Sequence, residues 1–179
     1  MALKWLLFCP QLPATPSSPR VTVWRRMRAA GSMGLDNGLW ILPRNEASVK
    51  IIQDVKTYIE AQGGSSKTFL ADAFDPATED EIIERFRQDR AQEYSEILEQ
   101  CNDFQAEIDK ETLNHNFSFA EFEENEQDLQ KLEEWFIKVK DRDFSGGSDA
   151  AGALNGLEKC RQALQAFATE VFNHEKYES

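Results

Sequence analysis

In the first 76 residues, apolar and polar positions follow the spacing of strands in some segments and the spacing of helices in others. A continuous apolar run at 4–9 predicts a strand covered on both faces, and apolar residues at helical spacing predict helices at 17–30 and 46–62. Asp36-Asn37-Gly38 predicts a tight hairpin turn before a strand at 39–42, because Asn-Gly accepts positive φ at both turn positions. Residues 66–74 predict a further strand. The resulting order, β-α-β-β-α-β, predicts a ferredoxin-like domain over 1–76 with two helices on one face of an antiparallel sheet.

Longer amphipathic helices are predicted after residue 76. Thr78 with Glu81 and Ser118 with Glu121 each match a capping box, in which a hydroxyl accepts the backbone N–H three residues further on. Apolar residues then recur at steps of three and four over 77–111, 122–139 and 154–171, with a flexible break at 145–148. We therefore expect an α+β protein, in which the ferredoxin-like domain is followed by a helical hairpin or three-helix extension over 77–179, acidic and packed on the domain.

The predicted helix at 17–30 has recognisable ends. Ser17 or Ser18 can cap its first turn, and Gly31 can end it, because glycine tolerates the left-handed conformation. Its apolar face consists of Val23, Trp24, Met27 and Ala30. Trp24 and Trp40 are accordingly interpreted as core residues rather than as platforms on which bases stack.

Charge is distributed unevenly along the chain. Residues 1–50 carry seven Lys or Arg and two acids, a net charge of +5, whereas the remainder carries 13 basic and 30 acidic residues, a net charge of −17. Arg25, Arg26 and Arg28 lie on one short helix and could neutralise nucleic-acid phosphates. In the alternative interpretation, these arginines pair with the acidic helices or are only solvated. The acidic part would also repel nucleic acid unless it faced away.

Four segments of the sequence together resemble a known family. They read LPATPSSPRVTVWRRMRAAG, GLWILP, DRAQEYSEIL and KVKDRDF followed by Gly-Gly. From about residue 3 to about residue 172, the chain resembles the N-terminal domain of the ChrB family of chromate-resistance regulators. Its WRR and GLWILP core is also similar to the middle domain of PaaX-type repressors, whose fold resembles the small ferredoxin-like subunit of CRISPR spacer-acquisition complexes.

The resemblance implies a transcription-regulator module that contacts nucleic acid through its basic helix. The implied contact residues are Arg20, Arg25, Arg26, Arg28 and Arg44. Full ChrB proteins carry a second, C-terminal domain thought to sense the oxyanion, and the sequence given stops before it. We therefore expect a stand-alone or partner-dependent role, with chromate sensing by this chain itself left open.

Residue patterns for other chemistry are absent from the sequence. No acid follows the first strand to hold a nuclease metal, and neither His115 nor His174 has a second ligand at metal-binding spacing. No P-loop, GxGxxG, GxSxG or HExxH motif occurs. Acidic runs such as 121–126 are interpreted as a solvated helix face. The expectation is a non-enzymatic protein without metal or cofactor.

The cysteines and the N-terminal segment indicate the cellular compartment in which we expect the protein. Three widely spaced cysteines without a CxxC motif fit buried thiols in a reducing cytoplasm better than a disulfide framework. The apolar run at 5–9 is too short for a signal peptide, and nothing approaches the roughly 20 apolar residues of a membrane span. We expect no membrane partner.

Two functions remain open on the sequence. In the first, a regulatory module binds nucleic acid through the arginine-bearing helix. In the second, the long acidic helices form a protein-interaction or dimerisation module without DNA binding, either for a homodimer or for a separately encoded sensor protein.

Overall fold

The computed structural model describes residues 4–35, 38–147 and 149–178. The chain divides into two compact units, Met1–Glu84 and Arg85–Ser179, with the boundary inside helix α3 (Pro76–Leu113). A four-stranded antiparallel sheet and five helices confirm the predicted α+β class.

The first unit contains all four strands and two complete helices. Its elements are β1 (Trp5–Gln11), α1 (Ser18–Ala29), β2 (Met33–Gly34), β3 (Trp40–Pro43), α2 (Glu46–Ala61) and β4 (Ser65–Ala71). The strands lie in the order β2-β3-β1-β4, and every neighbouring pair is antiparallel. Leu6 of β1 pairs with Leu42 of β3 on one side and with Leu70 of β4 on the other.

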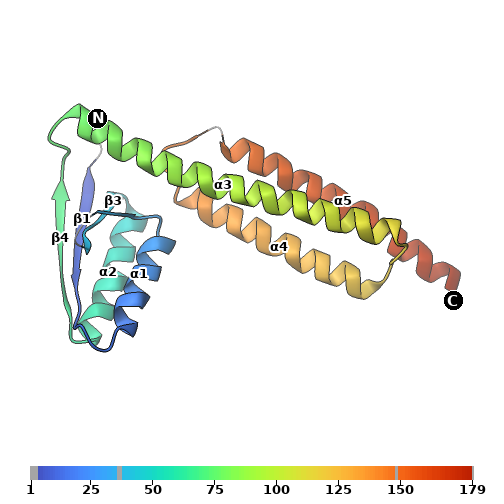
Figure 1. The fold of residues 1–179 in the computed structure, drawn as a ribbon, viewed down its shortest axis with the longest axis horizontal. Helices are drawn as coiled ribbons and strands as arrows, with labels where there is room; N and C mark the ends of the chain where they lie inside the picture. Colours follow the sequence, from blue (N-terminus) through green and yellow to red (C-terminus); the bar gives the residue numbers. More distant parts are fainter. Residues whose placement is uncertain (1–3, 36–37, 148, 179) are drawn as a thin grey trace. The chain divides into compact units, whose positions relative to one another are not determined.

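Helices α1 and α2 lie side by side over one face of this sheet (Figure 1). Alternate residues of the strands and one stripe of residues along each helix meet there. Side chains return to the same face every two residues in a strand and every 3.6 residues in a helix. The buried members of this core are Leu6, Phe8, Val23, Met27, Trp40, Leu42, Ile52, Val55 and Ile59. The prediction that Trp40 is a core residue is therefore confirmed.

Local hydrogen bonds explain where these elements begin and end. The Asn45 side chain accepts the backbone N–H of Ser48 and caps α2. Ser17 occupies the cap position of α1, but its side chain makes no capping hydrogen bond, in contrast to our expectation. Gly31 has φ +72° directly after α1, as predicted. Asp36 and Asn37 of the predicted turn lie outside the described residues, although the flanking strands pair as a hairpin.

Strand β4 lies at one end of the strand order, so one side of it is unpaired within the described sheet. Its side chains Phe69 and Leu70 are both about half exposed, at 53% and 55%. Lys67 carries the only charge between Ser65 and Ala71.

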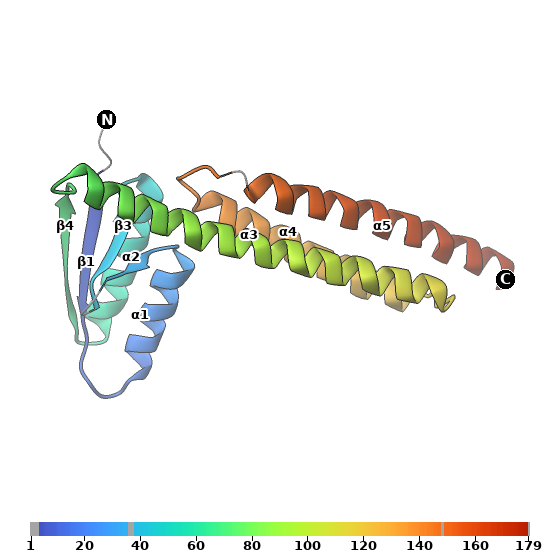
Figure 2. The ribbon, with the colours of Figure 1, turned by 45° about the horizontal axis from the view of Figure 1, so that its top comes forward.

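The second unit is built from three helices that run alongside one another (Figure 2). They are the part of α3 after residue 84, α4 (Phe119–Asp141) and α5 (Asp149–Glu178). One apolar core joins them, centred on Ile97, Cys101, Val139, Leu157, Cys160 and Val171. Gly156 allows close approach of α5, because a Cβ at this position would lie 2.9 Å from Leu98 Cδ1 and 3.3 Å from Cys101 Cβ.

The two predicted capping boxes have different outcomes. The Ser118 hydroxyl accepts the backbone N–H of Glu121 at 3.2 Å and caps α4, as predicted. The capping box predicted at Thr78 is wrong, because α3 begins earlier, at Pro76. Asp75 Oδ1 instead accepts the backbone N–H of Thr78 at 2.8 Å. Pro76 suits the first turn, where its missing N–H would have no helical partner.

Candidate nucleic-acid interface

Helix α1 presents a row of arginines to solvent because its opposite side is held in the core. Val23 and Met27 are buried against the sheet, one turn apart. Arg20, Arg25 and Arg28 lie on the exposed side of the helix. The Arg20 guanidinium donates to the backbone oxygen of Ala14 at 2.7 Å, which anchors it to the loop before α1.

Arg26 points toward α2 instead of lying in the same row. Its guanidinium carbon lies 4.4 Å from the centroid of the Tyr58 ring, a cation–π contact. Arg26 remains exposed and keeps its charge available, but its position is fixed by the aromatic ring.

All five arginines that the sequence singled out are exposed, and within the described residues none of them forms an ion pair. Among the described acids of the first unit, none therefore neutralises Arg20, Arg25, Arg26, Arg28 or Arg44 by an ion pair.

The prediction that Trp24 is a core residue is wrong, since its side chain is 54% exposed. Trp24 lies one turn after Arg20 and one turn before Arg28, and residues four apart share a helix face. Trp24 therefore lies on the same exposed helix face as Arg20 and Arg28. Val21, also exposed, lies beside it. We call Arg20, Val21, Trp24, Arg25 and Arg28 the Arg/Trp face of α1.

Arg44 lies apart from this face in sequence, at the start of α2. It lines a hollow of about 350 Å³ together with Asn45, Glu46, Val49, Lys50 and Gln53. Lys50 is exposed and, like Arg44, makes no ion pair within the described ranges. The first turn of a helix generally favours an anion, but in α2 Asn45 already accepts the N–H of Ser48 and Glu46 adds a negative charge.

Two of the segments that carry the family resemblance meet in the second unit. Tyr94, from DRAQEYSEIL, donates a hydrogen bond to Asp143 of KVKDRDF at 3.2 Å. Glu93 accepts an ion-paired hydrogen bond from Arg142, and its other oxygen lies 2.9 Å from Arg90 Nε. Burial, reinforced by Asp143, raises the pKa of Tyr94 to about 12. Burial also lowers the pKa of Arg90, and Glu93 opposes that shift. These side chains join α3 to the end of α4.

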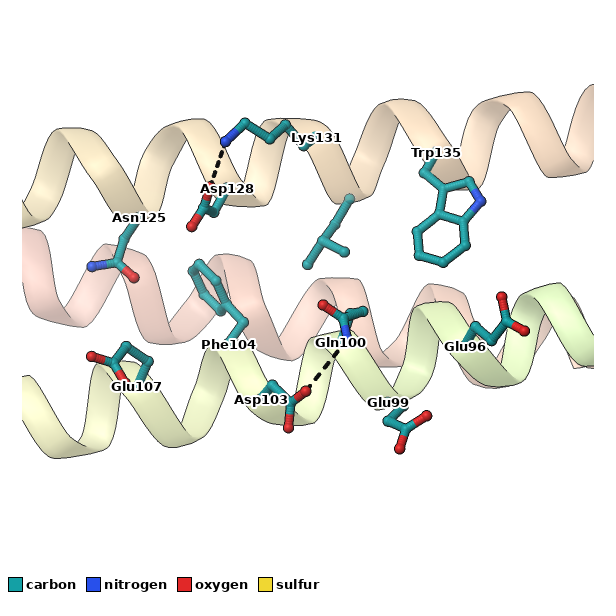
Figure 3. Close-up of a pocket in the computed structure, with 11 residues that line it drawn as sticks. Glu96, Glu99, Gln100, Asp103, Phe104, Glu107, Asn125, Asp128, Lys131 and Trp135 are labelled. Atoms are coloured by element: carbon teal, nitrogen blue, oxygen red, sulfur yellow. Dashed lines mark hydrogen bonds and ion pairs between the residues drawn. The ribbon is translucent and has the colours of Figure 1, made fainter. Parts of the chain in front are cut away.

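An acidic groove runs between α3 and α4 (Figure 3). Its volume is about 660 Å³, and Phe104, Leu132 and Trp135 provide its apolar lining. The remaining lining residues are Glu96, Glu99, Gln100, Asp103, Glu107, Asn125, Asp128 and Lys131. From the sequence we interpreted acidic runs as solvated, and we did not predict this groove. The spacing of Glu96, Glu99 and Asp103, which places them along one helix face, is the signal that could have indicated it.

The described residues lack two other kinds of functional feature. No three His, Cys, Asp or Glu side chains there are arranged to hold a metal ion. No helix there has both the length and the apolar character to cross a bilayer.

Comparison with known proteins assigns the chain to a family. A family model described as "Protein ChrB, N-terminal" matches residues 20–178. Protein ChrB of Cupriavidus metallidurans is 30% identical over 94 residues, which are 52% of this chain and 28% of the relative, so the match spans little more than a quarter of that protein. No solved structure matches the chain. The chain therefore belongs to the ChrB N-terminal family, as its four motif segments indicated.

Proposed function

We propose that this chain is a non-enzymatic regulatory module of chromate resistance, which contacts nucleic acid through the Arg/Trp face of α1. The observation that carries the proposal is that its arginines are exposed and without an ion pair among the described residues. Family membership supports the regulatory role. We also propose that the first unit, with the strand order β2-β3-β1-β4, is a ferredoxin-like domain.

The chemistry of this face suits a polyanion with exposed bases. Guanidinium groups bind phosphate oxygens in bidentate geometry, with two parallel hydrogen bonds. The exposed indole of Trp24 on the same face can stack on an unpaired base, a contact of about 1–3 kcal/mol. Arg44 and Lys50, at the start of α2, offer a second place for a phosphate.

The charges of the two units limit how strong this contact can be. The first unit has nine basic and ten acidic residues, whereas the second has eleven basic and 22 acidic residues. The second unit, at −11, repels nucleic acid, so binding depends on the local field of the arginines. We expect a contact that is clear at low salt and weakens steeply as salt is added.

Titration of a labelled oligonucleotide, duplex or single-stranded, by fluorescence anisotropy tests the proposal. Arg25→Glu/Arg28→Glu should weaken binding more than tenfold at ~50 mM salt and lower the salt slope by roughly two, because each phosphate contact contributes about 0.9 for a duplex. Lys56→Glu/Lys67→Glu makes the same charge change on other surfaces of the first unit and should bind nearly as the parent does. Absence of binding by the parent chain at low salt, or equal losses in both variants, would contradict the proposal.

A second candidate function is a protein-interaction or dimerisation module that uses the long acidic helices. The observation that favours it is the groove between α3 and α4, in which an apolar lining is bordered by carboxylates. A homodimer or a separately encoded sensor protein would be its partner. Light scattering on the purified chain, with and without candidate partners, tests it. A strict monomer that retains no partner would contradict it.

A further inference from the structure

The groove between α3 and α4 carries negative charge that the described part of the chain does not neutralise. Glu96 and Asp103 accept hydrogen bonds only from the neutral amides of Gln92 and Gln100, and Glu99 has no ion pair there. By contrast, Asp128 pairs with Lys131 at 2.7 Å, and Glu107 pairs with Lys110 at 2.8 Å. Three carboxylates on one border of the groove are therefore available to a cation.

The lining of the groove is apolar and belongs to the edge of the core. Phe104 is a core residue of the second unit, and Leu132 and Trp135 are partly buried against that core. Figure 3 shows Phe104 and Trp135 directed into the space between the two helices. An occupant of this groove therefore needs an apolar or aromatic side chain directed inward and cations toward α3.

We propose that the Arg/Trp face of α1 from a second copy of this chain occupies the groove. Trp24 is the exposed aromatic side chain of that face, and Arg20 and Arg28 flank it. At 1.5 Å per residue, Arg20 to Arg28 span about 12 Å along α1, and Glu96 to Asp103 span about 10.5 Å along α3. The guanidinium groups can thus meet the three carboxylates while the indole contacts Phe104, Leu132 and Trp135.

Each copy carries both halves of this contact. When α1 of each copy occupies the groove of the other, both contacts form within a symmetric dimer. When each copy instead binds a different neighbour, longer chains of molecules result. This inference deepens the second candidate function and rests on it, because it names the partner and the surface. Nucleic acid would compete with self-association for the same arginines.

A charge-swap experiment tests the contact by analytical ultracentrifugation at ~50 mM salt, where surface charges are weakly screened. Arg25→Glu/Arg28→Glu places two carboxylates of α1 opposite the acidic groove, and Glu99→Arg/Asp103→Arg places two guanidinium groups in the groove opposite the arginines of α1. Each variant alone should self-associate more than tenfold more weakly than the parent chain. An equimolar mixture should restore it as a 1:1 complex, since both contacts are then complementary.

A matched control separates this contact from a general effect of net charge. Glu123→Arg/Glu126→Arg changes two exposed acids of α4 that do not line the groove, and it should associate as the parent does. A monomeric parent chain, a mixture that does not associate, or a control that fails equally would overturn the proposal. The outcomes of this test are also distinguishable from a failure of nucleic-acid binding. The groove variant should still bind the oligonucleotide, and a chain that binds no oligonucleotide can still pass the charge swap.

Discussion

Tyr94 donates a hydrogen bond to Asp143 at 3.2 Å, although 49 residues separate them in the sequence. Asp143 also accepts from the Ser145 hydroxyl at 2.9 Å, through its other oxygen. The hydrogen bond therefore ties the middle of α3 to the turn that follows α4. Two motifs of the family thus have a structural role in holding the helices of the second unit together.

The raised pKa of Tyr94 predicts a loss of stability at high pH. Its pKa is about 12 in the folded chain, against an ordinary value of 10.0 for a tyrosine, mainly because burial disfavours the phenolate. Above pH 10 the unfolded state loses this proton before the folded state does. The free energy of unfolding should therefore fall by up to ~1.4 kcal/mol per pH unit until about pH 12. Urea unfolding at pH 9 and 11 should show a smaller fall for Tyr94→Phe than for the parent. Equal falls in the two proteins would contradict the assignment.

Glu93→Gln should destabilise the second unit by about 3 kcal/mol. Its carboxylate faces both Arg90 and Arg142, and without it these two guanidinium groups are left close together and partly desolvated. Chemical denaturation followed by circular dichroism measures the change. Asp109 is exposed on the same helix and forms no ion pair with a described residue, so Asp109→Asn should change stability by less than ~0.5 kcal/mol. A similar loss in both variants would argue against the charge cluster.

Two glycines of α5 should respond oppositely to alanine. At Gly156 the new Cβ would lie 2.9 Å from Leu98 Cδ1 and 3.3 Å from Cys101 Cβ, so we expect a net loss of about 1–2 kcal/mol despite the better helix propensity. At Gly152 nothing lies within 4 Å, and alanine should add up to ~1 kcal/mol. Thermal unfolding of the two variants checks the difference in sign. Stabilisation at Gly156 would contradict the close approach of α5.

The exposure of Trp24 predicts its fluorescence behaviour. Trp5 and Trp40 are buried and Trp135 is partly buried, so Trp24 should dominate collisional quenching by acrylamide. Trp24→Phe should remove more than half of the quenching and change stability by less than ~0.5 kcal/mol. Trp135→Phe serves as the comparison and should retain most of it. If Trp24→Phe left quenching unchanged, the indole would have to be buried.

The sequence predicted the elements well where local chemistry decides them. The capping residue Ser118 and the terminal Gly31 specify helix ends through their own hydrogen bonds or φ. It failed at Trp24, because an aromatic side chain beside the apolar stripe was assigned to the core. Only a narrow arc of α1, at Pro19, Val23 and Met27, is buried. Hydrophobic character alone does not determine burial.

Features that depend on distant partners were beyond the sequence. The hydrogen bond between Tyr94 and Asp143 and the groove beside Trp135 exist only once α3 and α4 are aligned. Periodicity gives the face of each helix but not the register between two helices. The exposure of the arginines likewise required the structure, because charge counts allow both solvated and paired arrangements.

The position of β4 has a consequence for handling the protein. Seven residues, Ser65–Ala71, leave one row of backbone N–H and C=O groups without a strand beside them in the described sheet. Phe69 and Leu70 add exposed apolar surface there. Such an edge is a template for intermolecular strand addition, and a lysine is the side chain that commonly discourages it. Replacing Lys67 by an apolar residue would remove that protection. Aggregation in concentrated or heated samples would then begin along this margin of the sheet.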